Sequence, residues 1–383
     1  MTISLVSAID EGNSVRVTWA NGVNSYYLYL WLRDNAPELL HASTHHRVVE
    51  TSSIPADVGA ESLSVDAGGL HIVWAHDGHH STFTSDWLRQ HDYTNGARHT
   101  PQPLTLWDAS NSAEIYHASY PRLLEDDHIR VAFLEGFCEY GLAILHDVPN
   151  EPGTVLDVAE QFGELRTTSW GTVFDVRSMI DANSVAYTNL PLVVHTDEGY
   201  RDPAPTVQLQ HFLQSETSGG MATLTDGFKV ATDLKAEDPE AFALLRDTVL
   251  RFHFADADNE HQSDAPVITA NGDGSLRAIK YSNHSAQPFL LPPEVMERYY
   301  AAYTTFGRMR ESEKYRFNIN MGAGDLYMVD NHRVMHGRTG FSGGGARHLQ
   351  SCYIERDELV NRLTVARRRL AARFVSHTKV SVP

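Results

Sequence analysis

The chain is poor in cysteine and in positive charge, and each shortage excludes a class of protein. Among 383 residues there are only two cysteines, Cys138 and Cys352. Two cysteines so far apart are too few for a disulfide framework or a thiolate metal site. Lys and Arg number 31 against 49 Asp and Glu, a formal net charge of −18. This excess of negative charge disfavours nucleic acids and anionic membranes as partners.

Long apolar runs are lacking as well. Residues 1–5 show no basic region leading into an apolar stretch, and no segment approaches the roughly 20 apolar residues that a membrane helix needs. We therefore expect a cytoplasmic protein whose partner is a small molecule. A chain of 383 residues can hold one large domain with a smaller one attached.

Alternating apolar and polar residues predict a mainly β protein with helices. Residues 1–92 predict a small β-rich N-terminal domain, with strands at 14–19 and 26–31 around the hairpin signal Asn21-Gly22. The polar, proline-bearing residues 93–120 predict a linker. Residues 121–383 predict a double-stranded β-helix (jelly-roll) domain, since strands flank a helical segment. Its helices are expected at 125–140, 156–162, 229–249, 293–310 and 355–373, and its later strands at 250–254, 277–282, 315–319, 325–329 and 347–354.

His195-Thr196-Asp197 ends an apolar run and predicts a strand that presents two metal ligands. Residues i and i+2 of a strand share a face, so the imidazole and the carboxylate can take neighbouring positions on one divalent ion. By itself such a pair is expected by chance in a chain with 21 histidines. With His336 far downstream it completes the two-His-one-carboxylate triad that suits non-haem Fe(II) oxygenases. Arg347, eleven residues after His336, can pair with the distal carboxylate of a dicarboxylic cosubstrate.

These residues resemble the Fe(II)/2-oxoglutarate-dependent oxygenases, and within them the γ-butyrobetaine hydroxylase group. The resemblance runs nearly end to end and is carried by Trp31-Leu32-Arg33-Asp34-Asn35, His195-Thr196-Asp197, Asp330-Asn331, His336-Gly337-Arg338, and Arg347-His348-Leu349 with Tyr353. It implies iron on His195, Asp197 and His336, 2-oxoglutarate on Arg347, and O₂ as the second cosubstrate. Ala222 stands where the family has Thr or Ser, so one contact to 2-oxoglutarate is either missing or supplied by Thr223. The resemblance also leaves a homodimer open.

The resemblance further implies an aromatic cage for a trimethylammonium group. A quaternary cation cannot donate hydrogen bonds but is attracted to ring faces. The matching positions are all aromatic: Trp170, Phe174, Tyr187 and Tyr353. One aromatic residue in a strand more often belongs to a core, so the four together indicate the cage.

The anion end of the substrate pocket departs from the family, which holds the substrate carboxylate with two asparagines. Asn283 matches one of them, but the other reads Ser184, with Asn183 beside it. A shorter donor leaves room for a tetrahedral phosphonate and favours 2-trimethylaminoethylphosphonate as substrate. Further candidates for charge neutralisation are Lys280, His284 and Arg201.

Three alternatives stay open for the substrate and the activity. The substrate anion can be the carboxylate of γ-butyrobetaine, whose hydroxylation makes carnitine. An unrelated amine, such as a trimethyllysine-like or sulfonated one, is a second option within the same family. A non-catalytic betaine-binding module is the third, although such a module would not require the complete His, Asp, His and Arg set. The sequence leaves the stereochemistry of hydroxylation undecided.

The zinc site in the family's N-terminal domain lacks its cysteines here. The three cysteine positions read Ala36, Glu38 and His41, while the later His79 is retained. A thiolate site is thereby excluded. Glu38, His41 and His79 are acceptable zinc ligands by type, but we expect a metal-free domain held together by packing.

Overall fold

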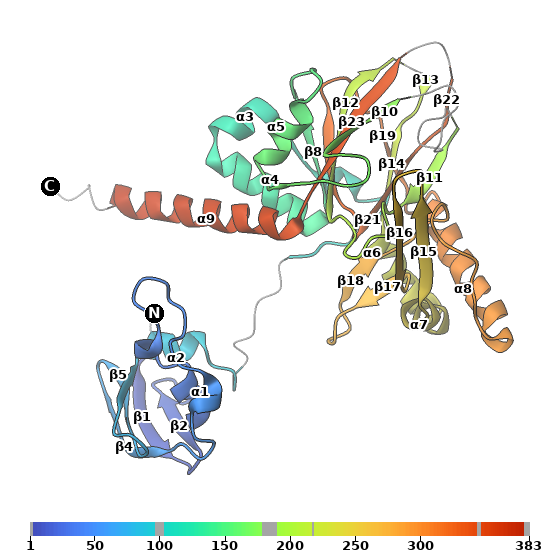
Figure 1. Cartoon of the computed structure of the whole chain (residues 1–383). Coiled ribbons are helices and arrows are strands. Elements are labelled where there is room, and N and C mark those ends of the chain that lie inside the picture. Colours follow the sequence, from blue (N-terminus) through green and yellow to red (C-terminus); the bar gives the residue numbers. More distant parts are fainter. Residues whose placement is uncertain (1–2, 96–102, 178–189, 217, 343–345, 379–383) are drawn as a thin grey trace. The chain divides into compact units, whose positions relative to one another are not determined.

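The computed structural model describes residues 3–95, 103–177, 190–216, 218–342 and 346–378 (Figure 1). It divides into two compact units, Met1–Pro101 and Gln102–Pro383. None of the described helices is long and apolar enough to cross a membrane.

The smaller unit contains two three-stranded antiparallel sheets. They are formed by β1 (Leu5–Asp10), β2 (Ser14–Trp19) and β3 (Asn24–Leu28), and by β4 (Ala60–Asp66), β5 (Gly69–Trp74) and β6 (His80–Phe83). Its helical segments are α1 (Tyr29–Asp34), η1 (Pro37–Leu39), η2 (Thr51–Ser53) and α2 (Ser85–Gln90). The prediction of a strand over 26–31 is wrong for residues 29–31. The chain becomes helical at Tyr29, because Tyr29, Leu32 and Arg33 then share one buried face at helical spacing.

Two facing sheets make up the core of the larger unit and confirm the predicted jelly roll. The larger sheet has the order β10-β23-β12-β20-β8-β7, with β9 paired to β23, and the smaller has the order β11-β21-β14-β19. The strands of the larger sheet are β7 (Tyr116–Ser119), β8 (Leu142–His146), β9 (Leu165–Arg166), β10 (Val173–Arg177), β12 (Val207–Ser215), β20 (Leu326–Asp330) and β23 (Arg347–Ile354). Those of the smaller sheet are β11 (Leu192–His195), β14 (Ala222–Asp226), β19 (Phe317–Ile319) and β21 (Val334–Arg338).

The larger sheet is buried on both faces. In β8, Ala143 and Leu145 belong to the core shared with the helices, whereas Leu142 and Ile144 face the core between the two sheets. A strand buried on both faces carries a continuous apolar run, which is why 142–145 lacks polar alternation. The helices on the outer face are α3 (Tyr120–Glu125), α4 (Asp127–Tyr140), α5 (Thr154–Glu160) and α9 (Arg356–Thr378) (Figure 1).

A helical insertion follows β14 and has its own apolar core. It comprises α6 (Gly227–Glu237), α7 (Pro239–Asp247), the hairpins β15 (Leu250–Ala255) with β16 (Glu260–Ala265) and β17 (Ile268–Ala270) with β18 (Leu276–Ile279), and α8 (Pro293–Glu311). The single helix expected over 229–249 is wrong. Pro239 cannot donate a backbone hydrogen bond, and the side chain of Asp238 caps a new helix by accepting from the Ala241 amide.

The expected linker over 93–120 is also shorter than predicted. Residues 116–119 form β7, which pairs in parallel with β8 in the larger sheet. Trp107 is fully buried and donates its indole N–H to the Tyr140 carbonyl. The residues from 103 onward therefore belong to the larger unit. Outside these elements, η3 (Ser112–Glu114) and the small ladder of β13 (Ser218–Gly219) with β22 (Phe341–Ser342) complete the described chain.

One buried histidine couples the stability of the larger sheet to pH. His211 on β12 is fully buried, and neither ring nitrogen has a hydrogen-bond partner among the described residues. Burial lowers the pKa of His211 from 6.5 to about 4. The unfolded chain therefore takes up a proton below pH 6.5 that the folded state excludes. Above pH 6.5 the histidine is neutral in both states and does not lower the free energy of unfolding. As the pH falls from 6.5 toward 4, protonation of the unfolded chain lowers the free energy of unfolding.

We expect His211→Phe to reduce the acid sensitivity of the fold. In the wild type this residue should remove about 2 kcal/mol of unfolding free energy between pH 7.5 and pH 5. Urea unfolding at both pH values measures the difference, with His80→Phe at an exposed histidine as the control. An equal loss of stability in the wild type and in His211→Phe would contradict the assignment.

Candidate active site

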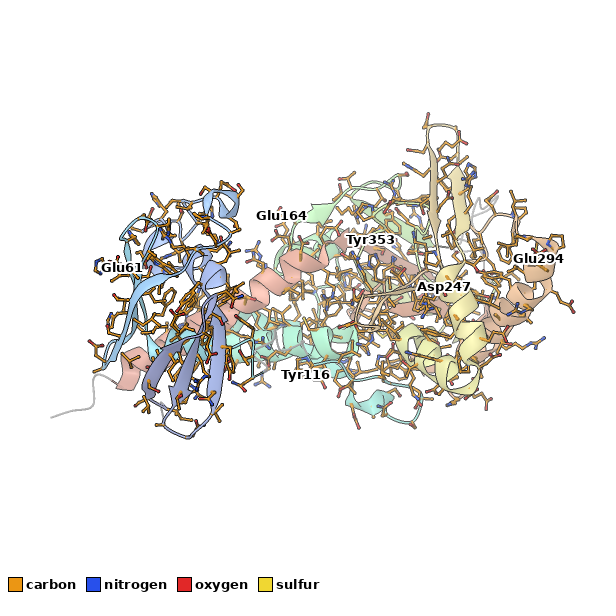
Figure 2. All side chains as sticks on the ribbon, turned by 90° about the horizontal axis from the view of Figure 1, so that it is seen from below. Glu61, Tyr116, Glu164, Asp247, Glu294 and Tyr353 are labelled. Atoms are coloured by element: carbon orange, nitrogen blue, oxygen red, sulfur yellow. The ribbon has the colours of Figure 1, made fainter. Side chains whose placement is uncertain are left out.

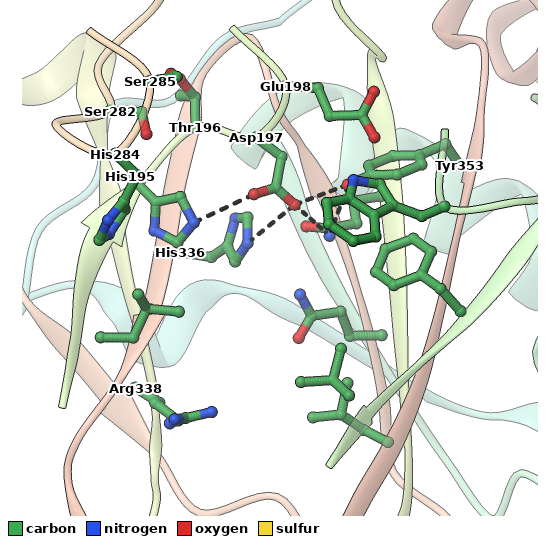
Figure 3. A pocket seen from close by; sticks show the side chains of 18 of the residues that line it. His195, Thr196, Asp197, Glu198, Ser282, His284, Ser285, His336, Arg338 and Tyr353 are labelled. Carbon is green, nitrogen blue, oxygen red and sulfur yellow. Dashed lines mark hydrogen bonds and ion pairs between the residues drawn. The ribbon is translucent and has the colours of Figure 1, made fainter. Parts of the chain in front are cut away.

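Two strands of the smaller sheet bring the predicted metal ligands together. β11 pairs antiparallel with β21, and His195 stands directly opposite His336. Gly337 allows this close approach, because a Cβ there would collide with the Leu192 carbonyl. The ligand atoms of His195, Asp197 and His336 all lie within 4.8 Å of one another (Figure 3). Within the described parts of the chain, this is the one group of three or more His, Cys, Asp or Glu side chains with that geometry.

The hydrogen bonds around these side chains leave the metal-binding atoms available. His195 donates from Nδ1 to the Val193 carbonyl at 2.9 Å, so Nε2 is the nitrogen that faces Asp197, 3.2 Å from Oδ1. His336 Nε2 lies 3.5 Å from Asp197 Oδ2. Burial opposes ionisation of Asp197, but His336 and His195 outweigh it and hold the pKa of this carboxyl well below its usual range. Two imidazole nitrogens and one carboxylate oxygen fit Fe(II).

The carboxylate of Asp197 is held by three neighbouring side chains. Gln208 Nε2 donates to Oδ2 at 2.7 Å, and Tyr353 Oη donates to the same oxygen at 2.8 Å. Asn331 fixes the backbone: its Oδ1 accepts from the Asp197 amide at 2.7 Å and its Nδ2 donates to the Asp197 carbonyl at 3.0 Å. These contacts set the direction in which the carboxylate points before any metal binds.

A cavity of about 390 Å³ opens onto the group of three ligands. Figure 3 shows polar residues gathered beside His195, aromatic rings beside Tyr353, and Arg338 beyond the group. The polar residues are Thr196, Ser282, His284 and Ser285, and the aromatic ones include Trp170, Phe174, Tyr200, Phe254 and Tyr353. The cavity thus offers a cationic, an aromatic and a hydrogen-bonding region around one metal-ligand group.

The cationic region contains two buried arginines. Arg347 is 9% exposed, and its Nε has no hydrogen-bond partner among the described residues. Burial lowers the pKa of Arg347, and burial together with Arg347 lowers the pKa of Arg338 to about 10. The guanidinium groups lie 5.7 Å and 5.1 Å from the Phe341 ring centre. An unsatisfied buried N–H beside a second cation fits a carboxylate of 2-oxoglutarate.

The aromatic region brings three of the four predicted cage residues to the cavity. The Phe174 and Tyr353 rings are 5.7 Å apart, and Trp170 lies 5.5 Å from Phe254. Phe254 in turn stacks on Tyr200 at 4.9 Å. Figure 2 labels Tyr353, which is 1% exposed. The fourth predicted residue, Tyr187, lies outside the described residues.

Two expected contacts find no support in the structure. Asn283 is exposed and absent from the cavity lining, and its Oδ1 accepts from Tyr303 Oη at 2.7 Å. Thr223 donates from Oγ1 to Asn318 at 2.8 Å, while its neighbour Ala222 lines the cavity. Since successive side chains of a strand point to opposite faces, Thr223 faces away. Asn183 and Ser184 lie outside the described residues.

Of the three further candidates for charge neutralisation, only His284 lines the cavity. Its ring makes an edge contact with His195, 5.7 Å between centres. Lys280 donates from Nζ to Ser263 at 3.2 Å, and Arg201 pairs with Glu198. The neighbouring segment is tied to the metal-ligand loop, because Thr196 donates to the carbonyl of Tyr281 and accepts from its amide, both at 3.0 Å.

The residues at the family's zinc position form hydrogen bonds with their neighbours. Glu38 Oε1 accepts from the Ser81 hydroxyl and lies 3.2 Å from His79 Nε2. His41 Nδ1 contacts Ser43 within its own turn at 3.2 Å. Glu38, His41 and His79 do not form a three-ligand group in the part of the chain that the structure describes, so these residues do not fit a zinc ion.

The sequence analysis did not identify several cavity residues. Gln208 had a usable signal, because the alternating run 207–212 places polar Gln208 and Gln210 on one face of a buried strand. Glu198 and Tyr200 lie one and three residues after Asp197 in the sequence. Phe254 gave no signal, since it comes from the β15–β16 hairpin far along the chain.

Glu198 has the most constrained environment of these residues. It is 6% exposed, has a backbone φ of 50°, and lies with Oε2 2.5 Å from Arg201 Nε. Burial raises the pKa of Glu198 to about 7, although Arg201 acts in the opposite direction.

Comparisons with known proteins agree with this geometry. Residues 100–353 match the taurine catabolism dioxygenase TauD, TfdA family, and residues 6–89 match the γ-butyrobetaine hydroxylase-like N-terminal family. The chain is 35% identical over 371 residues to the γ-butyrobetaine dioxygenase of Pseudomonas sp. (strain AK-1), covering 95% of this chain and 96% of the relative. It is 29% identical over 381 residues to the γ-butyrobetaine dioxygenase of Homo sapiens, covering 96% and 98%. It is 30% identical over 353 residues to the mitochondrial trimethyllysine dioxygenase of Bos taurus, covering 90% and 83%.

We expect Gln208→Leu to weaken Fe(II) binding about 10- to 100-fold, because it removes one of the two donors that orient Asp197. Anaerobic calorimetric titration with Fe(II) measures the affinity. The matched control is Gln214→Leu, at an exposed glutamine on the same strand. Equal affinity in Gln208→Leu and the wild type would show that the hydrogen bond does not orient the ligand.

Proposed function

Because the chain belongs to the TauD/TfdA family and is a 2-oxoglutarate-dependent non-haem iron dioxygenase, we propose that it hydroxylates an unactivated C–H bond of a small trimethylammonium zwitterion. The observation that carries this proposal is one cavity in which the metal-ligand group lies beside an aromatic region. The relatives named for γ-butyrobetaine and trimethyllysine support the same substrate class.

In this proposal His195, Asp197 and His336 bind the iron, and Arg347 binds the distal carboxylate of 2-oxoglutarate. When bound, the two cofactors supply the oxidation: 2-oxoglutarate is decarboxylated to succinate and CO₂, and one oxygen atom of O₂ enters the substrate C–H bond. Gln208 holds the Asp197 carboxylate in place throughout. The residues of the chain therefore act by binding and orientation.

The cation is bound by ring faces in this proposal. Trp170, Phe174 and Tyr353 line the cavity, and Tyr187 is the predicted fourth member of the cage. A desolvated cation over an aromatic face gains about 2 kcal/mol or more. The hydroxyl of Tyr353 is already engaged by Asp197, so the ring is held fixed beside the metal ligands.

The finer proposal is that the substrate anion is a phosphonate. Hydroxyl groups of Thr196, Ser282 and Ser285, with the ring of His284, line the region beside His195. The three oxygens of a phosphonate accept more hydrogen bonds than a planar carboxylate, and the short side chain expected at 184 leaves room for them. Binding at both ends fixes which carbon faces the iron, and such positioning can account for a large share of the rate enhancement.

γ-Butyrobetaine is the second candidate substrate. It is favoured by the 35% identity to a γ-butyrobetaine dioxygenase over nearly the whole chain. Its carboxylate would use the same polar region.

The two candidates are separated by incubating the enzyme with Fe(II), 2-oxoglutarate and O₂ and offering each substrate alone, with products read by mass spectrometry. We expect a gain of one oxygen atom on 2-trimethylaminoethylphosphonate. If only γ-butyrobetaine gains an oxygen atom, the substrate anion is a carboxylate and the phosphonate proposal is wrong. If neither compound gains an oxygen atom, both proposed substrates are wrong. If a His195→Ala variant still releases succinate, the assignment of His195 as an iron ligand is wrong.

Substitutions in the aromatic region and in the cationic region should affect different Michaelis constants. We expect Trp170→Leu to raise the KM for the trimethylammonium substrate roughly 10-fold or more and to leave the KM for 2-oxoglutarate nearly unchanged. Arg347→Met should have the opposite pattern, because it removes the cosubstrate anchor. Steady-state kinetics with each compound varied in turn measures both, and a rise in both constants in either variant would contradict the assignment of separate regions.

A further inference from the structure

We propose that Glu198 supplies a negatively charged wall to the aromatic cage and selects a permanent cation over a neutral group of the same shape. The inference rests on the proposed function, because it adds a specificity residue to the same substrate site. None of the predicted cage residues carries a charge, so the aromatic rings by themselves distinguish a cation only through their π faces.

The position of Glu198 is the first observation. Its side chain lines the cavity, and the residue is 6% exposed. Figure 3 shows its carboxylate on the same side of the metal-ligand group as Tyr353. Trp170 and Phe174 line the same cavity. A trimethylammonium group bound against these rings would therefore lie close to the carboxylate.

The state of the carboxylate oxygens is the second observation. Both oxygens are buried, and among the described residues the carboxylate is paired with one cation, Arg201. Ionisation of a buried carboxylate is costly, and each further opposite charge beside it reduces that cost. A quaternary ammonium can add a second opposite charge without donating a hydrogen bond, as the proposed substrate would.

Arg201 acts on Glu198 from outside the cavity. Its Nε lies 2.5 Å from Glu198 Oε2, and its Nη2 donates to Ser169 Oγ at 2.6 Å. Ser169 directly precedes Trp170, so the pair joins the carboxylate to the segment that carries a cage residue. Arg201 is absent from the cavity lining. The arginine therefore orients the carboxylate from a position outside the cavity lining.

The backbone gives a third, independent observation. Glu198 has a φ of 50°, in the left-handed region that side chains other than glycine rarely adopt. Strain of this kind persists where the surrounding structure needs a particular side-chain position, and it clusters at ligand sites. Here it directs Glu198 to the cavity immediately after the metal ligand Asp197.

The test compares two ligands of equal shape. At pH 8, where the Glu198 carboxylate is ionised, the enzyme is loaded with Fe(II) and 2-oxoglutarate without O₂. It is titrated calorimetrically with 2-trimethylaminoethylphosphonate and with the isostere in which a tert-butyl group replaces trimethylammonium. Glu198→Gln keeps the shape and removes the charge. We expect about 10-fold weaker binding of the cation and less than a 2-fold change for the isostere.

A second variant and a metal titration guard against indirect effects. Glu198→Met fills the site without a polar group, and it should likewise weaken binding of the cation but not of the isostere. The Fe(II) affinity of both variants should stay within 2-fold of the wild type, since Glu198 is not one of the three ligands.

Three outcomes would overturn the inference. If the variants bind both ligands more weakly by the same factor, Glu198 acts only as a structural partner of Arg201. Unchanged binding of the cation would remove any role in recognition. Binding of neither ligand by the wild type would overturn the proposed substrate class and this inference together, whereas the first two results leave the substrate class intact.

Discussion

The placement of one carboxylate, that of Asp197, is the constraint on which the rest of the site depends. Its backbone is fixed by Asn331, and its Oδ2 accepts from both Gln208 and Tyr353. These three residues come from β12, from β23 and from the turn after β20, so strands of the larger sheet hold a ligand that follows a strand of the smaller one. The metal site therefore forms only when the two sheets face each other in register.

The same carboxylate connects the metal to the substrate region. Tyr353 donates to Asp197 and its ring lies 5.7 Å from that of Phe174, so one proposed cage residue also holds a proposed metal ligand. Glu198 is the next residue in the chain. Beyond the metal ligands, Arg347 offers a buried N–H that has no hydrogen-bond partner in the described part of the chain. The proposed cation and iron sites are thus joined through Asp197 by one covalent and one hydrogen-bonded connection, which suits the proposed positioning of one C–H bond toward the iron.

The sequence predicted those parts of the site whose residues repeat a spacing or a family pattern. His195 and Asp197 stand two residues apart at the end of an apolar run, and His336 and Arg347 follow at the expected interval, so they could be found without coordinates. The expected strand is shorter than predicted, because it ends at His195 and Asp197 lies in the turn that follows. Thr223 could not be judged, because a shift of one residue along a strand reverses the face. Glu198 and Phe254 were missed since their proximity to the cage comes from tertiary packing. Likewise, the helix expected over 229–249 was divided by a local capping interaction at Asp238 that periodicity does not reveal.

The most direct test is a crystal structure of the enzyme grown without O₂ with Fe(II), 2-oxoglutarate and the trimethylammonium substrate, with the metal located by anomalous scattering at the iron edge. The account predicts one iron peak among His195, Asp197 and His336, a 2-oxoglutarate carboxylate on Arg347, and the substrate nitrogen between Trp170 and Glu198. Iron bound elsewhere, or a substrate whose anion occupies the aromatic region, would contradict it.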